Sequence, residues 1–388
     1  MTFTQLYLQE CAPPHLRGAM LVMFQFWISL GSTIGTIIDN YTATIESRLC
    51  YQIPLCLLFV VPVLLTLVSP FIPDTPRWLI SHGKEEQALI ALRRLRGSWY
   101  HETLIAEEFQ EIKEAWDIEQ EYAKTASIWD MFRGTDLRRT VLSIIAVCFQ
   151  AASGSMFLLI YGTYFFLMSG STQPFQDSII VSCIGLAAVM MMTVIVRHLS
   201  RRTILIVAFT IQAFSMLIIA VIYTAAPTSP AALKCLVAFV CIYIFFYGGW
   251  TSPVAWLVAG EIPSQRLRSY TLGFGAGAGF LFGWVCAFTA PYFINPLDLN
   301  WGPKYGYIWF GSNLVTAIFI FFFIPETKDR TLEEIDEMFQ NKVAARKFSS
   351  YQCVVSEQAR EHGVNKLGEK GVVMLEQVES VNPDGGSV

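Results

Sequence analysis

Long uncharged stretches separated by short charged segments are the main pattern of this chain of 388 residues. Each stretch lacks Asp, Glu, Lys and Arg and is mostly apolar. An α-helix needs about 20 such residues to cross about 30 Å of hydrocarbon. We therefore predict an all-α membrane protein with eight transmembrane helices. The stretches are residues 19–38, 49–73, 140–176, 178–196, 203–233, 235–260, 269–297 and 305–325.

Lys and Arg are concentrated in every second loop. Arg138 and Arg139 lie between the second and third spans, Arg201 and Arg202 follow the fourth, and Arg266 follows the sixth. The alternate loops each carry one such residue at most. Because Lys and Arg favour the cytoplasmic side of a membrane, the basic loops and both ends of the chain are expected in the cytoplasm.

One long polar insert divides the chain into unequal parts. Its pattern predicts amphipathic helices over residues 84–96 and 102–124, with apolar residues at helical spacing. We expect four parts. Residues 1–73 are the two-helix remnant of an N-terminal half, and residues 74–139 are a cytoplasmic helical linker. Residues 140–325 are a six-helix C-terminal half, and residues 326–388 are a cytoplasmic tail.

The tail is expected to begin with a short helix. Thr331 and Glu334 fit a capping box, in which two side chains satisfy the first free backbone N–H groups of a helix. Leu332, Ile335 and Phe339 then recur on one face.

Composition narrows the classes of function. Apolar residues make up 54% of the chain and charged residues only 15%, against about 25% in ordinary soluble domains. The nine cysteines are scattered without a CxxC pair, so no metal site and no cofactor are expected. No Asp, Glu, His or Lys lies inside a span, which argues against an enzyme, and no basic stripe suggests nucleic acid.

A two-part signature occurs twice in the chain. ECAPPHLR at residues 10–17 matches EIPSQRLR at residues 261–268, and PDTPR at residues 73–77 matches PETK at residues 325–328. The copies lie 251 and 252 residues apart. Repeated membrane helix pairs are typical of transporters built from two related halves. Four spans, residues 140–176, 178–196, 203–233 and 235–260, lie between the end of the first copy and the second copy. By symmetry, four further spans are expected before the first copy, and residues 1–388 alone are expected to insert without catalysing uptake.

Two of these boxes, together with a third motif at residues 200–202, carry a resemblance to a known family. PDTPRWL at residues 73–79, SRR at 200–202 and PETKD at 325–329 resemble the PESPRWL, GRR and PETKG boxes of the sugar porter family of the major facilitator superfamily. The resemblance implies a twelve-helix bundle whose helices five to twelve are the spans seen here. Residues 295–302 look more like fungal α-glucoside permeases than animal glucose carriers.

Charged residues flank the spans at the expected cytoplasmic face. The resemblance implies pairs across the halves, Glu10 with Arg268 and Glu261 with Arg17, that form in one conformation and bias a two-state equilibrium. The alternative is that they are interface anchors with snorkelling arginines. The other gating charges we expect are Arg77, Arg201 and Glu326.

Uncharged polar residues within spans are the candidates for substrate contact. A sugar offers hydroxyl groups and apolar C–H faces, so its site needs amides and an aromatic ring. Gln25, Gln150 and Trp256 match sugar-contacting positions of the family, and Tyr161 can add a hydroxyl group. The alternative for each Gln is helix-packing contact, and for Trp256 an interfacial belt position.

The chain departs from the family pattern around this site. Five of its residues there are smaller or less polar than the family's, which implies a wider and less polar pocket: Ala151, Met156, Gly185, Gly279 and Phe280. A further departure is Arg197, which replaces the acidic residue that normally precedes the GRR box.

The sequence therefore predicts a plasma-membrane protein that moves a hexose or disaccharide by alternating access. Proton symport and facilitated diffusion both remain open. One alternative is a non-transporting sugar sensor or interaction protein, which the altered pocket favours and the intact charge boxes oppose. The other is an inactive shortened product.

Overall fold

The computed structural model describes residues 7, 10–12, 17–97, 101–125, 127–195, 198–226, 229–328, 330, 332–351 and 353. Helices form all the regular structure in these ranges, which confirms the all-α prediction. Among them, seven stretches are long and apolar enough to cross a membrane, and the first predicted span lies in an eighth helix, α2, Arg17–Thr42. The seven are Leu49–Phe71, Gly134–Met168, Pro174–Ile195, Arg201–Ala225, Pro230–Glu261, Gln265–Ile294 and Gly302–Phe323.

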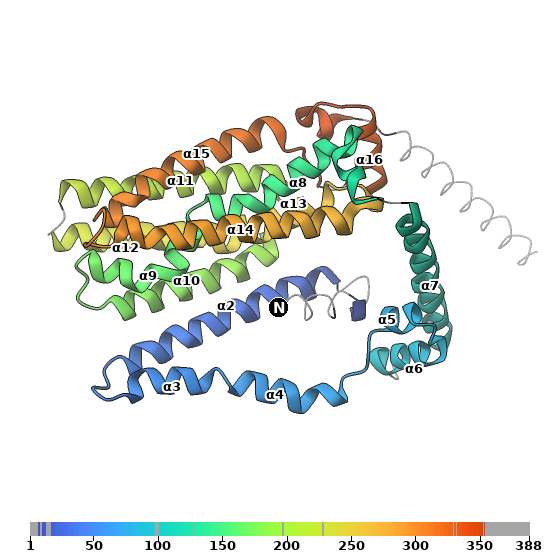
Figure 1. Cartoon of the computed structure of the whole chain (residues 1–388), viewed down its shortest axis with the longest axis horizontal. Helices are drawn as coiled ribbons and strands as arrows, with labels where there is room; N and C mark the ends of the chain where they lie inside the picture. Colours follow the sequence, from blue (N-terminus) through green and yellow to red (C-terminus); the bar gives the residue numbers. More distant parts are fainter. Residues whose placement is uncertain are drawn as a thin grey trace, which may run out of the picture.

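The C-terminal spans form one bundle, in which α11 packs along α15 and α12, and α14 packs along α8 (Figure 1). Its elements are α8 (Gly134–Ala152), α9 (Ser155–Met168), α10 (Pro174–Ile195), α11 (Arg201–Ala225), α12 (Pro230–Phe245), η3 (Phe246–Thr251), α13 (Ser252–Glu261), η4 (Gln265–Leu267), α14 (Arg268–Ile294), η5 (Gly302–Tyr305) and α15 (Gly306–Phe323).

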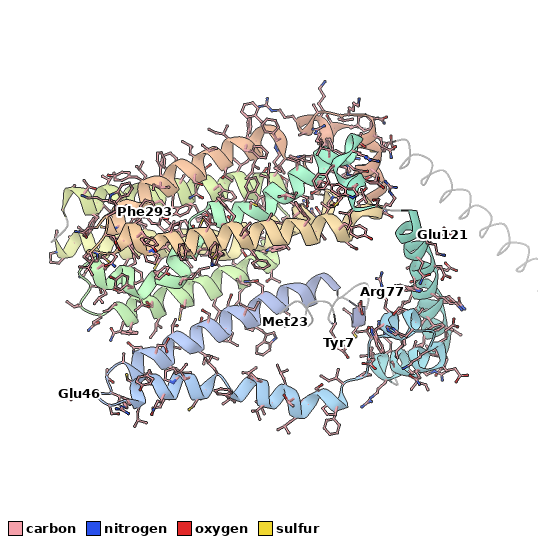
Figure 2. The ribbon with its side chains drawn as sticks, viewed as in Figure 1. Tyr7, Met23, Glu46, Arg77, Glu121 and Phe293 are labelled. Carbon is pink, nitrogen blue, oxygen red and sulfur yellow. The ribbon has the colours of Figure 1, made fainter. Side chains whose placement is uncertain are left out.

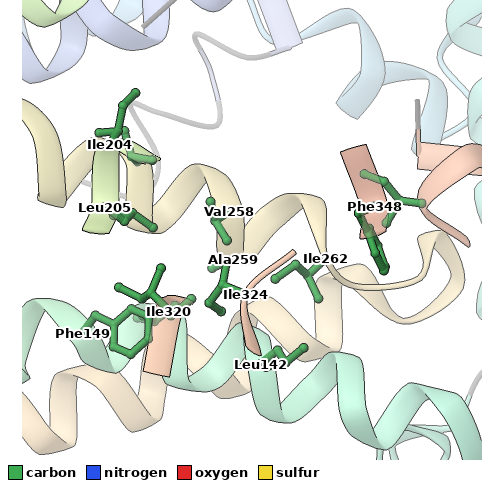
Figure 3. Packing of buried hydrophobic residues seen from close by; sticks show 14 of the residues in the cluster. Leu142, Phe149, Ile204, Leu205, Val258, Ala259, Ile262, Ile320, Ile324 and Phe348 are labelled. Atoms are coloured by element: carbon green, nitrogen blue, oxygen red, sulfur yellow. The ribbon is translucent and has the colours of Figure 1, made fainter. Parts of the chain in front are cut away.

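An apolar cluster joins three of these helices. Phe149 from α8, Val258 and Ala259 from α13, and Ile320 from α15 are buried together (Figure 3). Small side chains such as Ala259 let membrane helices approach closely. This packing fixes the positions of α8 and α13 relative to each other.

The N-terminal helix pair lies beside the bundle. Helix α2 packs against α10, and the hydroxyl group of Thr33 donates to the carbonyl oxygen of Ser182 at 3.4 Å. The second predicted span is divided into α3 (Leu49–Leu57), α4 (Val60–Val68) and η1 (Ser69–Phe71). Pro62 has no N–H to donate to the carbonyl group of Leu58, which interrupts the helix there. No residue of α3 or α4 is buried.

The linker contains three α-helices, α5 (Pro76–Ser81), α6 (Glu85–Arg96) and α7 (Glu102–Thr125), followed by the short helix η2 (Ile128–Phe132). Helices α6 and α7 coincide with the amphipathic segments predicted from sequence. Leu79 and Ala88 are buried against partly buried aromatic residues of α7. Arg96 ties this unit to the segment before α2. Its guanidinium donates to Glu108 at 2.8 and 2.5 Å and to the carbonyl oxygen of Cys11 at 2.8 Å.

The tail folds back onto the bundle through α16 (Leu332–Gln340) and η6 (Ala345–Ser350). Ile335 and Phe339 are buried, as the apolar stripe predicted, and Phe339 packs edge-on against Phe348 with ring centroids 5.2 Å apart. Thr331 of the predicted capping box and the side chain of Leu332 lie outside the described residues.

Candidate functional site

The third predicted span is interrupted between α8 and α9. Gly154 has a φ angle of +85°, and a Cβ atom added to it would lie 2.5 Å from two ring atoms of Trp309. Only glycine satisfies both conditions without strain. The carbonyl groups freed by this break are bonded from neighbouring helices: Tyr243 and Asn313 donate to Ser153 at 2.8 and 2.9 Å.

A second interruption lies in the span Pro230–Glu261. Helix α12 passes into a π-helical turn, η3, before α13 begins. Within this turn Gly249 lies so close to α10 that a Cβ atom would be 2.7 Å from the carbonyl oxygen of Ala188. Single π-turns inside membrane helices are frequent at functional sites because they redirect side chains.

Two predicted substrate residues meet where these interruptions face each other. The side-chain amide of Gln150, at the end of α8, donates to the backbone oxygen and the hydroxyl oxygen of Ser252, both at 2.9 Å. The indole N–H of Trp256 donates to the amide oxygen of Gln150 at 3.1 Å. The Trp256 side chain is 37% exposed. We call Gln150, Ser252 and Trp256 the amide cluster.

The amide cluster has the chemistry a sugar needs. The amide oxygen of Gln150 has a second lone pair, and its orientation is fixed by three hydrogen bonds. An exposed ring, Phe280, lies 6.5 Å from the ring of Trp256 by centroids. Fixed polar atoms beside aromatic surface suit a ligand that carries both hydroxyl groups and C–H faces.

The other two predicted contacts lie elsewhere. The hydroxyl group of Tyr161 donates to the carbonyl oxygen of Ala287 at 3.3 Å and thereby joins α9 to α14. Gln25 is half-buried in α2. Within the described part of the chain, no hydrogen bond joins Gln25 or Tyr161 to the amide cluster.

Three predicted gating charges come together at one end of the bundle. Arg201 forms an ion pair with Glu261 at 2.9 Å, and Thr327 donates to the same carboxylate at 2.6 Å. Glu326 accepts from the backbone N–H groups of Arg201 and Arg202 at 3.1 and 3.2 Å. It therefore satisfies free N–H groups at the start of α11, where the helix dipole favours a carboxylate.

The structure describes both members of only one of the two pairs expected across the halves. Glu261 binds Arg201, and the pair of Glu261 with Arg17 lies outside the described residues because the side chain of Arg17 is not among them. Among the described ion pairs none joins Glu10, which is half-buried before α2, to Arg268, which is exposed at the start of α14. Arg77 lies half-buried on α5 (Figure 2).

Sequence reasoning missed two buried polar residues. Gln212 in α11 is fully buried, and its amide nitrogen lies 2.5 Å from the hydroxyl oxygen of Thr251 in η3. Its mid-span depth was the same signal that selected Gln150. Arg139 is also buried; it donates to the backbone oxygen of Ile262 at 2.7 Å and pairs with Asp336 of the tail. In the sequence, Arg139 indicates only the topology of the chain.

Comparison with known proteins agrees with this architecture. The model of the family "Sugar (and other) transporter" matches residues 1–339. The chain is 30% identical over 353 residues to the major facilitator-type transporter ecdD of Aspergillus rugulosus, covering 88% of this chain and 65% of that protein. It is also 30% identical to the high glucose sensor RGT2 of Saccharomyces cerevisiae, covering 86% of this chain and 45% of that protein. It thus spans less than two thirds of the length of either relative.

Solved structures share the fold. The inward-open xylose transporter XylE of E. coli superposes with a TM-score of 0.69 at 22% identity, covering 86% of this chain and 68% of that one. The proton:xylose symporter XylE bound to 6-bromo-6-deoxy-D-glucose gives a TM-score of 0.64 at 24% identity, covering 86% and 70%. The chain belongs to the sugar (and other) transporter family and has the helical fold of the major facilitator superfamily.

Proposed function

We propose that this chain is part of a sugar transporter that works by alternating access, with a hexose or disaccharide as its substrate. The observation that carries the proposal is the amide cluster, which lies where two interrupted helices face each other. Transporters commonly build substrate sites from such interrupted helices near the bilayer midplane. The fructose transporter ght6 of Schizosaccharomyces pombe is a further relative, at 28% identity.

Gln150 and Trp256 are the contacts we assign first, because each presents a fixed polar or aromatic group in the amide cluster. Gln25 is assigned to the opposite wall of the substrate path, since α2 packs against α10 of the bundle. Tyr161 is assigned a secondary position, because its hydroxyl group is already bonded to α14.

The ion pair of Arg201 with Glu261 is proposed as the fixed unit of the gate. It already holds the end of α13 against the start of α11. The cross-half pairs of Glu10 with Arg268 and of Arg17 with Glu261, together with Arg77, would then form in another conformation. Glu326 keeps the start of α11 in place during this exchange.

Two finer points concern proton coupling and the membrane in which the protein lies. Proton symport is favoured because a fold neighbour is described as a proton:xylose symporter. A plasma-membrane location is favoured by the expected topology and by the proposed substrate, a sugar.

Sugar uptake in a yeast host that lacks its hexose carriers tests the proposal. The full reading frame around this sequence is compared with its Gln150→Ala variant and with Gln173→Ala, a matched control in the exposed segment between α9 and α10. We expect saturable uptake that Gln150→Ala impairs and Gln173→Ala leaves unchanged. Equal uptake by all three proteins would contradict the assignment of Gln150 to the substrate site.

A sugar sensor is the second candidate. The similarity to the high glucose sensor RGT2, at 30% identity, favours it. A sensor of this fold would bind sugar without moving it. Saturable binding by the purified protein, combined with no uptake in the same host, would decide for the sensor.

A further inference from the structure

Two arginines flank the aromatic rings at the end of α15. The guanidinium carbon of Arg202, at the start of α11, lies 5.4 Å from the ring centroid of Phe321. That of Arg346, on η6, lies 4.5 Å from the centroids of both Phe321 and Phe322. We call these four residues the arginine–phenylalanine site. They bring together three segments that are far apart in the sequence.

Positive charge is in excess around the arginine–phenylalanine site, although the Glu326 carboxylate lies close enough to Arg202 to attract its charge. Among the residues the structure describes, no carboxylate oxygen forms an ion pair with Arg202 or Arg346. Glu326, which follows α15, is engaged by backbone N–H groups, including that of Lys328 at 3.0 Å. Two adjacent guanidinium groups that share only this one nearby carboxylate attract a further anion.

The tail holds Arg346 in this position. Ala345 and Phe348, on either side of it in η6, are buried. Arg330 donates to the backbone oxygens of Phe348 and Tyr351 at 3.2 and 2.8 Å. A site on such an anchored segment loses little entropy when a ligand binds.

The arginine–phenylalanine site lies at the boundary of a candidate membrane span. Phe321 and Phe322 belong to the last turn of the span Gly302–Phe323, and their side chains are 45% and 52% exposed. Exposed rings on a spanning helix face hydrocarbon, whereas arginine side chains reach toward the headgroups. The site therefore offers apolar surface and positive charge at the depths where a lipid has its chains and its phosphate.

We propose that the arginine–phenylalanine site binds an anionic phospholipid. Its phosphate would lie between the guanidinium groups of Arg202 and Arg346, and its acyl chains would run along Phe321 and Phe322. The planar guanidinium can bind two phosphate oxygens at once. The positive-inside pattern places this end of α15 in the leaflet where anionic lipids are enriched.

Native mass spectrometry of the purified, delipidated chain tests the proposal. The protein is incubated with an equimolar mixture of phosphatidylglycerol and phosphatidylcholine, and bound lipids are counted. We expect preferential retention of phosphatidylglycerol, lowered about fivefold by Arg346→Gln, since one basic residue at a membrane surface contributes a factor of that size. Arg346→Lys, which keeps the charge but not the planar group, should fall between the two.

The control is Lys124→Gln, which removes one exposed positive charge on α7, away from α15. It should retain phosphatidylglycerol like the unmodified chain. Equal loss in both glutamine variants, or no preference for phosphatidylglycerol, would overturn the proposal. A further experiment adds glycerol 3-phosphate as a competitor. If this compound displaces the lipid, the site binds a soluble phosphate and not a phospholipid. Arg346 is exposed, so its variants are expected to fold, and unchanged thermal midpoints verify this.

Discussion

Gly154 determines the geometry of the break that positions Gln150, and replacing it with alanine tests that statement. An alanine with a φ angle of +85° would be in the left-handed region, which costs about 1–2 kcal/mol. Its Cβ atom would also lie 2.5 Å from Cγ and Cδ2 of Trp309. These atoms lie near the root of a buried ring that packs against Tyr305, so the ring cannot move aside freely.

The contact adds to the backbone cost. Overfilling a packed core typically costs about 1–3 kcal/mol. We therefore expect Gly154→Ala to lose roughly 2–5 kcal/mol in total. The assay is thermal unfolding of the purified chain in detergent, followed by tryptophan fluorescence.

Two matched glycines separate the two contributions. Gly170 has a φ angle of +90° but nothing within 4 Å of an added Cβ atom, so Gly170→Ala measures the backbone cost alone. Gly162 lies within helix α9, also with open space around it, and its alanine variant should gain up to about 1 kcal/mol. The expected order of stability is Gly162→Ala, then Gly170→Ala, then Gly154→Ala. If Gly154→Ala were as stable as Gly170→Ala, the contact with Trp309 would not matter and our account of the break would be wrong.

Three further variants or probes give distinct outcomes. Tyr243→Phe removes one donor to the break and should cost about 1 kcal/mol in the same unfolding assay; no change would show that the bond is dispensable. Arg96→Met leaves the partly buried carboxylate of Glu108 unpaired and should cost about 3 kcal/mol, the lower end of the range for a broken buried pair. Arg93→Met, whose ion pair is exposed, should cost less than about 1 kcal/mol, and equal losses would contradict this. Burial raises the pKa of the Cys353 thiol, so maleimide at pH 7 should modify the exposed Cys235 before it modifies Cys353. Mass spectrometry determines the order of labelling, and faster labelling of Cys353 would show that the tail is not packed on the bundle.

The spans could be predicted because uncharged runs of sufficient length have few alternatives to a membrane helix. Their interruptions could not all be predicted. Pro62 was a visible signal for the division between α3 and α4. The break at Gly154 was not visible, because glycine is common in membrane helices and its need for a positive φ angle depends on Trp309, far away in sequence.

Individual site residues could be selected by depth and chemistry, but their partners could not. Gln150 and Trp256 were chosen separately, and their hydrogen bond depends on how α8 packs against α13. The same limit affected Glu261. The family resemblance implied Arg17 as a partner of Glu261, and the bundle also brings Arg201 to within 2.9 Å of its carboxylate, which the sequence did not indicate.

The central claim is that the amide cluster binds sugar. Equilibrium binding of radiolabelled glucose and maltose to the purified chain in lipid vesicles tests it most directly, with Gln150→Ala and the control Gln173→Ala measured in parallel. Loss of Gln150 leaves a hydroxyl group of the bound sugar without its partner, at a cost of about 1–3 kcal/mol, so we expect the dissociation constant of the sugar to rise roughly 5- to 150-fold. The control should bind like the unmodified chain. No saturable binding of either sugar, or an unchanged dissociation constant in Gln150→Ala, would contradict the account.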